Sequence, residues 1–409
     1  MTGLGKRLFA VVGVPTLATL LVVAVESPVA ASVPPSPVGD GRASQQSGAN
    51  VTASARLAVP ALRTNVVMRG LDIPWDIAVL PSGAWLVTER DRQRILIKRP
   101  GRKARVVSNG PAGLWSSGET GLMSILADPK IAKNDRFYTC NGWQRGGNRP
   151  DIRVLAWKLN KARTKARVVD TLLSGIQVTS GRHGGCRLRL DSAGAMFVGT
   201  GDAAVGTNPQ DLHSLNGKLL RMNRFTGRAW PTNPWIHSAN RHKRFIYNYG
   251  HRNVQGLALR ANGTMWSVEH GTDRDDEVNL AIRGGNYGWN PVPGYDESTP
   301  MTDYSLPGRQ IGARWRSGYP TLATSGAVWV KGKQWGRYQG TLAVCALKAS
   351  RLLFMRFDRR GKLVWVKTPP AMRGTYGRLR SVVQRANGDL LVTTANGGGT
   401  DKVIRVHPR

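Results

Sequence analysis

A strand–turn–strand pattern that recurs along the chain constrains its fold more than any other sequence feature. Each copy has a short apolar run, a polar turn that ends in glycine, and a second apolar run. Two such runs joined by a tight turn are typical of a β-hairpin, because glycine reaches the positive φ angles that these turns require. The copies lie at residues 75–88, 186–199, 255–268 and 381–394, with turn glycines Gly83, Gly194, Gly263 and Gly388.

Weaker copies of the pattern lie between these hairpins, at residues 121–141 and 325–357. After residue 60, no window longer than about 12 residues has the periodicity of an amphipathic helix. All-strand repeats of roughly 40 to 60 residues are typical of β-propellers, and about 340 folded residues divided by that period give about six blades. The sequence therefore predicts an all-β fold, a six-bladed β-propeller. A β-helix is the alternative, but its rungs would be shorter and more regular.

The first residues have the layout of a secretory signal peptide. Lys6 and Arg7 precede the apolar stretch 8–25, and Ala30 and Ala31 offer a cleavage site. We expect residues 1–31 to be removed and the protein to be secreted or associated with the cell envelope. An uncleaved membrane anchor is the alternative, because the stretch is nearly long enough to span a bilayer. Residues 32–63 are rich in Pro, Ser, Ala and Gly and are predicted to be a disordered linker, which leaves 64–409 as the propeller domain.

The chain is strongly basic, with 59 Lys and Arg against 25 Asp and Glu and a formal net charge of +34. Its basic residues are scattered through most turns and form neither a basic helix nor a platform of basic and aromatic side chains. This distribution favours a solubilising surface near an acidic envelope. Nucleic acid is not the expected partner.

Three cysteines, Cys140, Cys186 and Cys345, leave at least one thiol without a partner inside the chain. Cys140 and Cys186 fall in predicted strands of neighbouring repeats. We therefore expect these two to form a disulfide.

Polar residues stand just before the predicted inner strands, whose loops converge at one end of a propeller's channel. His183, between glycines, suits a general base, and a turn histidine bonded to the backbone is the alternative. Arg252 precedes its hairpin in the same way and suits an anionic or carbonyl oxygen, unless it forms a surface ion pair. Lys348, Arg378 and Arg380 also lie near strand ends. Together these residues predict a cationic central site for a ligand with several carboxylates.

An acidic segment, residues 269–277, follows the third hairpin. Dense oxygen donors after a glycine suit calcium, although the spacing is not that of an EF-hand loop. A solvated acidic turn is the alternative.

Six short motifs, taken together and in this order, resemble those of one family. They lie at residues 118–122, 183–185, 199–202, 250–256, 275–280 and 284–289. Over about residues 70–408 the chain is similar to the soluble aldose (glucose/sorbosone) dehydrogenases that depend on pyrroloquinoline quinone (PQQ). These enzymes are six-bladed propellers.

The resemblance implies oxidation of an aldose sugar at its anomeric carbon to a lactone, with hydride transfer to PQQ and an external electron acceptor. It implies that His183 is the general base supported by Asp202, and that Arg252 and Asn253 hold the quinone edge. Further cofactor contacts are implied for Thr321, Lys348, Arg378 and Arg380, and substrate contacts for Glu119, Asp202 and Tyr319. Implied calcium ligands are the carbonyls of Gly271 and Thr272 and, at a second, structural position, Asp276, Glu277 and Tyr287.

The expected substrate rim departs from the glucose enzymes. Arg182 replaces an acid just before the base, Glu119 and His270 replace glutamines, and Tyr319 replaces a tryptophan. The resemblance therefore implies an aldose without singling out glucose. The alternative function is a non-catalytic secreted propeller that binds acidic glycans or a protein partner, and the sequence is also compatible with a homodimer.

Overall fold

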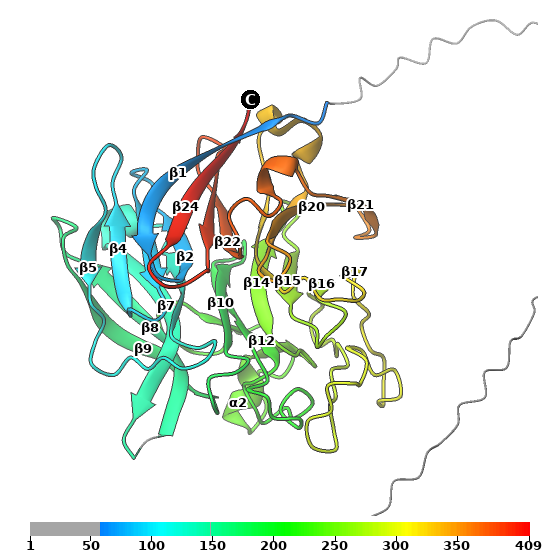
Figure 1. Ribbon diagram of the computed structural model, residues 1–409. Helices are drawn as coiled ribbons and strands as arrows, with labels where there is room; N and C mark the ends of the chain where they lie inside the picture. The colour runs from blue at the N-terminus through cyan, green and yellow to red at the C-terminus, as the bar shows by residue number, and fades with distance from the viewer. Residues whose placement is uncertain (1–57, 148) are drawn as a thin grey trace, which may run out of the picture. The chain divides into compact units, whose positions relative to one another are not determined.

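The structure of the protein is a computed structural model that describes residues 58–147 and 149–409. The expected signal peptide and most of the expected linker lie outside the described residues. The described chain forms six four-stranded antiparallel sheets, the blades of a β-propeller (Figure 1). The predicted fold class is therefore confirmed.

Five blades are built from strands that follow one another in sequence. The first two comprise β2 (Pro74–Val79), β3 (Trp85–Glu89), β4 (Arg94–Lys98), β5 (Arg105–Ser108), and β6 (Leu122–Ala127), β7 (Arg136–Arg145), β8 (Arg149–Leu159), β9 (Ala166–Gln177). The next two comprise β10 (Gly185–Leu190), β11 (Ala195–Thr200), β12 (Lys218–Asn223), β13 (Ile246–Tyr249), and β14 (Val254–Leu259), β15 (Met265–Glu269), β16 (Glu277–Leu280), β17 (Trp315–Arg316). The fifth comprises β18 (Thr324–Trp329), β19 (Leu342–Ala346), β20 (Arg351–Phe357) and β21 (Leu363–Lys367).

The sixth blade joins the two ends of the described chain. The strand β1 (Leu62–Leu71) pairs with β24 (Asp401–Pro408), beside β23 (Leu390–Thr394) and β22 (Leu379–Gln384), and the pair is visible in Figure 1. β1 begins two residues before the predicted domain boundary because Leu62 already pairs with Pro408. This pairing closes the ring, so no blade is left at an open end.

The four predicted hairpins are confirmed as the first two strands of four blades. Their turn glycines have φ angles of 76°, 82°, 83° and 90°, in the region that favours glycine. The inner strands β2, β6, β10, β14, β18 and β22 neighbour one another in a closed ring. Apolar side chains on the strands pack between adjacent blades, as in the cluster of Trp75, Tyr138, Leu188 and Val198.

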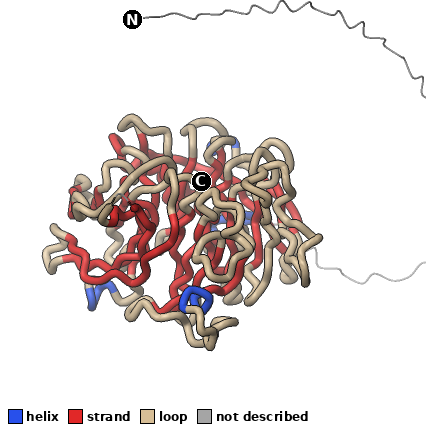
Figure 2. Tube along the Cα trace, turned by 90° about the horizontal axis from the view of Figure 1, so that it is seen from below, coloured by secondary structure: helices blue, strands red, loops and turns tan. Residues whose placement is uncertain are grey.

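Helices are short throughout the described residues (Figure 2). They are α1 (Ile131–Asn134), α2 (Arg241–Phe245) and the 3₁₀ turns η1 (Lys333–Tyr338) and η2 (Pro370–Met372). Within residues 58–147 and 149–409, none is long and apolar enough to span a membrane.

The predicted disulfide is present. Cys140 of β7 is bonded to Cys186 of β10, which ties the second blade to the third. Cys345 of β19 is buried as a free thiol.

Candidate functional site

The loops that precede the inner strands meet at one end of the channel. The backbone N–H of Gly185 donates to Asn253 Oδ1 (3.1 Å), and the N–H of Glu119 donates to the carbonyl of Gly181 (3.0 Å). Gly201 is needed for this approach, because a Cβ there would lie 1.9 Å from the carbonyl oxygen of His183. Residues from three blades are thereby brought together, as the sequence predicted.

His183 is buried, with its ring held by a carboxylate. Its Nδ1 lies 2.8 Å from Asp202 Oδ1, and its backbone φ of 53° is in the left-handed region, which a non-glycine residue occupies only at a cost. Asp202 is buried as well and also accepts the N–H of Ala204 (2.8 Å). A carboxylate on Nδ1 favours the tautomer protonated there, which leaves Nε2 as a free acceptor. No described residue hydrogen-bonds Nε2, so this nitrogen can take a proton.

Two further residues, which had no role predicted from the sequence, hold the carboxylate of Asp202. The Tyr295 hydroxyl donates to Asp202 Oδ2 (2.7 Å) and lies 2.9 Å from His183 Nδ1, while Trp289 Nε1 donates to Asp202 Oδ2 (2.8 Å). Burial and the charge of Asp202 raise the pKa of Tyr295, so its hydroxyl remains a donor. Trp289 stood within a recognised motif, whereas Tyr295 lies beyond it in a loop without periodicity.

Arg252 is buried and pairs with an unpredicted carboxylate. Its Nη2 donates to Glu297 Oε1, and the other oxygen of Glu297 accepts Arg182 Nη2 at 2.6 Å. Glu297 is partly exposed; burial raises the pKa of its carboxyl, but the hydrogen bonds from the two guanidinium groups outweigh burial and lower it. The Nε of Arg252 is buried without an acceptor. The Arg252 guanidinium therefore retains donor capacity toward the site.

Asn253 belongs to a chain of polar contacts across the channel. Its Nδ2 donates to Glu119 Oε2 (2.9 Å), and its Oδ1 accepts Gln255 Nε2 (2.9 Å). Gln255 Oε1 in turn accepts Arg380 Nη1 at 2.7 Å. The four side chains fix one another's orientation.

Burial dominates the electrostatics of this cluster. Burial, reinforced by Arg90, lowers the pKa of Arg380 to about 9. Burial also lowers the pKa of His270 to about 3, so its ring is neutral, and its Nε2 has no acceptor. Burial raises the pKa of Glu119, but its polar surroundings, among them the hydrogen bond from Asn253 and the charge of Arg380, outweigh burial and lower it.

The remaining expected cofactor and rim residues differ in exposure. Lys348 and Arg378 are exposed, and neither side chain forms an ion pair with any described carboxylate. Thr321 is buried, and its backbone N–H donates to the carbonyl of Asp273 (2.8 Å). Tyr319 is 75% exposed, as a residue at a rim would be.

The expected calcium ligands behave as two different groups. The carbonyl oxygens of Gly271 and Thr272 accept no hydrogen bond from described residues and could bind a cation. Asp276 is instead buried against the backbone N–H groups of Gly271 (3.0 Å) and Leu322 (2.7 Å).

The side-chain oxygens of Glu277 and Tyr287 also form hydrogen bonds within the protein. The Glu277 carboxylate accepts Arg316 Nε (3.1 Å) and Asn279 Nδ2 (3.2 Å), and the Tyr287 hydroxyl donates to the carbonyl of Leu280 (2.5 Å). Among the described residues no group of three or more His, Cys, Asp or Glu side chains is arranged for a metal. The oxygens of the expected second calcium position thus have protein partners among the described residues, and calcium at this position stays a prediction.

A buried lysine, which the sequence did not single out, holds the loop after β11 that carries Asp202. Lys218 Nζ donates to the carbonyls of Asn208 (2.7 Å), Pro209 (3.1 Å) and Asn216 (2.6 Å). Burial lowers its pKa to about 7. The lysine serves as an internal cap for three buried carbonyls, of which that of Pro209 also accepts the N–H of Gly250 (3.1 Å).

Comparisons with known proteins find chains that are similar to this one. The sequence model named glucose/sorbosone dehydrogenase matches residues 71–405. An aldose sugar dehydrogenase of Escherichia coli is 28% identical over 239 residues, 58% of this chain and 64% of that protein. Quinoprotein glucose dehydrogenase B of Acinetobacter calcoaceticus is 27% identical over 260 residues, 57% of this chain and 53% of that protein. The matched regions thus span less than two thirds of these two relatives.

Solved structures match over most of the chain. The PQQ-bound aldose sugar dehydrogenase of Streptomyces coelicolor is 25% identical, with a TM-score of 0.71, over 86% of this chain and 100% of that chain. The apo-form of the soluble aldose sugar dehydrogenase of Escherichia coli is 25% identical, with a TM-score of 0.75, over 85% of this chain and 100% of that chain.

Proposed function

The chain belongs to the glucose/sorbosone dehydrogenase family, and from this premise we propose that it is a PQQ-dependent dehydrogenase that oxidises an aldose at its anomeric carbon to the lactone. The observation that carries the proposal is the buried His183–Asp202 pair, whose free Nε2 belongs to the same loop cluster as Arg252 and Asn253. The names of the similar proteins support this reading over a non-catalytic binding propeller.

The described side chains fit PQQ, an aromatic tricarboxylate with a quinone edge. Arg252 and Arg380 each have a buried Nε without an acceptor, so the site holds donor capacity that the protein itself does not use. We assign Arg252 and Asn253 to the quinone edge, Lys348, Arg378 and Arg380 to the carboxylates, and Thr321 to a further contact. When bound, PQQ would supply the two-electron acceptor for the hydride.

The chain's own residues would handle the proton and the charge. His183 Nε2 takes the proton of the anomeric hydroxyl, while Asp202 holds Nδ1 and stabilises the imidazolium that forms. Arg252 and Asn253 would direct N–H donors at the quinone oxygen on which negative charge develops. Donors that are already fixed in place need no reorganisation of the site during the reaction. Glu119, Asp202 and Tyr319 are proposed to border the sugar.

We also propose one calcium ion on the carbonyls of Gly271 and Thr272, supported by their lack of hydrogen-bond donors. The second calcium position, at Asp276, Glu277 and Tyr287, stays a prediction from the family resemblance. Export of the enzyme remains a proposal, supported by the layout of residues 1–31 and by the Cys140–Cys186 disulfide, a bond typical of oxidising compartments.

The proposal is tested by reconstitution with PQQ and calcium, followed by dye reduction with a panel of aldoses, the dye standing in for the external acceptor. We expect His183→Ala to abolish turnover while PQQ binding, measured by absorbance, is kept. His213→Ala, which changes an exposed histidine, is the control. If the wild-type protein binds no PQQ and oxidises no aldose, the proposed function is wrong.

A further inference from the structure

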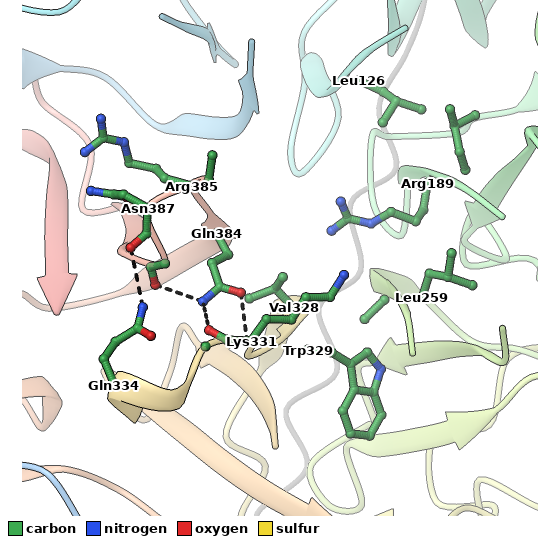
Figure 3. A pocket seen from close by; sticks show the side chains of 15 residues that line it. Leu126, Arg189, Leu259, Val328, Trp329, Lys331, Gln334, Gln384, Arg385 and Asn387 are labelled. Atoms are coloured by element: carbon green, nitrogen blue, oxygen red, sulfur yellow. Dashed lines mark hydrogen bonds between the residues drawn. The ribbon is translucent and has the colours of Figure 1, made fainter. Parts of the chain in front are cut away.

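A large cavity lies at the opposite end of the channel from His183. It has a volume of about 760 Å³ and is lined by 15 residues, among them the last residues of β10, β14 and β18 (Figure 3). His183 precedes the first residue of β10, whereas Arg189 and Leu190 end that strand. The cavity is therefore separate from the candidate active site, and its volume is typical of a pocket for a small organic ligand.

The cavity has an apolar side and a polar side. Figure 3 shows Leu126, Leu259 and Trp329 on one side, and the amides of Gln334, Gln384 and Asn387 on the other. The Arg189 guanidinium and the Lys331 amino group point into the space between the two sides. The lining includes three basic residues, Arg189, Lys331 and Arg385, and no Asp or Glu.

The Arg189 guanidinium forms no ion pair with any described carboxylate, although the nearby charge of Asp76 acts on it. Its Nε and Nη2 donate to the backbone carbonyls of Leu257 (3.1 Å) and Ala327 (3.3 Å), which fixes the guanidinium at the cavity. Burial lowers its pKa. By contrast Arg187, two residues earlier, pairs with Asp76 at 2.7 Å. Because desolvated charges in proteins are normally paired, Arg189 lacks the counter-ion that its neighbour has.

Lys331 adds a second cation without a partner. Its Nζ forms no hydrogen bond or ion pair with the described residues, although its backbone is held on both sides by Gln384. The Gln384 amide also donates to the carbonyl of Gly388 (2.8 Å), so the polar side is ordered before any ligand arrives. Arg385 differs, because Asp389 lies 3.5 Å from its guanidinium.

We propose that this cavity is a second ligand site, which binds a small organic anion made of a carboxylate on an apolar ring. The carboxylate lies between Arg189 and Lys331, where it supplies the missing counter-ion. The ring lies against Leu259 and Trp329. The general positive charge of the chain attracts many anions, and the pairing of two cations without ion-pair partners with an apolar wall favours an anion that carries a ring.

The test is calorimetric titration of the full chain with 1-naphthoate and, separately, with the neutral 1-naphthylmethanol. We expect naphthoate to bind at one site and the alcohol to bind at least about tenfold more weakly, since its hydroxyl carries no negative charge to pair with the two cations. Lys331→Gln should weaken naphthoate binding about tenfold. Lys333→Gln, two residues away and outside the lining, should leave it unchanged.

Two further variants keep the result clear. Arg189→Gln should weaken binding at least as much as Lys331→Gln, and if it does not fold, Lys331→Gln decides alone. Arg252→Gln, at the other end of the channel, should have no effect, which separates this cavity from the proposed active site. Absence of binding, equal losses in Lys331→Gln and Lys333→Gln, or a loss only in Arg252→Gln would each overturn the proposal.

Discussion

Replacement of Tyr295 by phenylalanine tests whether the loop after Trp289 supports the base. The change removes one hydroxyl, which donates to Asp202 Oδ2 (2.7 Å) and lies 2.9 Å from His183 Nδ1, and keeps the ring that packs on His183. Asp202 would retain three donors, from His183, Trp289 and Ala204. Loss of one hydrogen bond to a buried carboxylate costs about 1.5 kcal/mol, which corresponds to about tenfold in rate.

We therefore expect Tyr295→Phe to lower kcat about tenfold while KM stays within about twofold, because the hydroxyl orients the base and does not touch the sugar. Steady-state dye reduction measures both constants, and absorbance titration checks that PQQ binding is unchanged. Tyr304→Phe, which changes a tyrosine that is 64% exposed, is the matched control. An unchanged kcat, or a rise in KM alone, would refute the assignment of Tyr295 to the base.

Three more predictions follow from other contacts. Glu297→Gln should tighten PQQ binding to the apoprotein about threefold at low salt, because a partly exposed carboxylate no longer neutralises the guanidinium groups of Arg182 and Arg252. Asp296→Asn, which changes an exposed neighbour, is the control, and equal tightening in that variant would contradict the prediction. Burial lowers the folded-state pKa of Lys218 to about 7, against 10.5 for a free lysine. Between these values the unfolded chain binds more protons at this residue than the folded chain does. The contribution of Lys218 to the free energy of unfolding therefore rises with pH there, by up to about 1.4 kcal/mol per unit. The free energies of unfolding of wild type and Lys218→Met, measured with urea, should therefore diverge between pH 7 and 10. Parallel pH profiles of the two proteins would contradict the lowered pKa of Lys218. Replacing Cys140 and Cys186 by serine should lower the free energy of unfolding by about 2–5 kcal/mol, since the disulfide closes a loop across a sequence separation of 46. Urea unfolding measures this loss, and an unchanged urea midpoint would contradict the prediction.

Much of the candidate site was predictable because its residues stand beside strands with clear periodicity. His183, Arg252 and Asn253 come just before inner strands, and the ring places them together as expected. Arg378 and Arg380 were both expected at the central site, yet Arg380 is buried against Gln255 whereas Arg378 is exposed. Their separation follows from the start of β22 at Leu379, which leaves Arg378 outside the strand.

The expected second calcium position shows why oxygen-rich segments are ambiguous. Asp276, Glu277 and Tyr287 have the chemistry of calcium ligands, but loop ends also need caps for their backbone groups. In the folded chain Asp276 caps Gly271 and Leu322 instead. Spacing along the chain cannot distinguish the two uses, because both require only an oxygen near a turn.

The sequence by itself determined the hairpins, the number of blades and the disulfide, because these depend on local periodicity and on turn glycines. Only the tertiary structure decided which distant polar groups share one carboxylate or one guanidinium. Tyr295 contacts His183 although the two are 112 residues apart in sequence, and Glu297 contacts Arg182 at a separation of 115 residues. The physical reason is that closure of the ring brings loops from separate blades into one buried volume, where each charge must find a partner. At the far end of the channel the same closure leaves Arg189 and Lys331 facing a cavity without one.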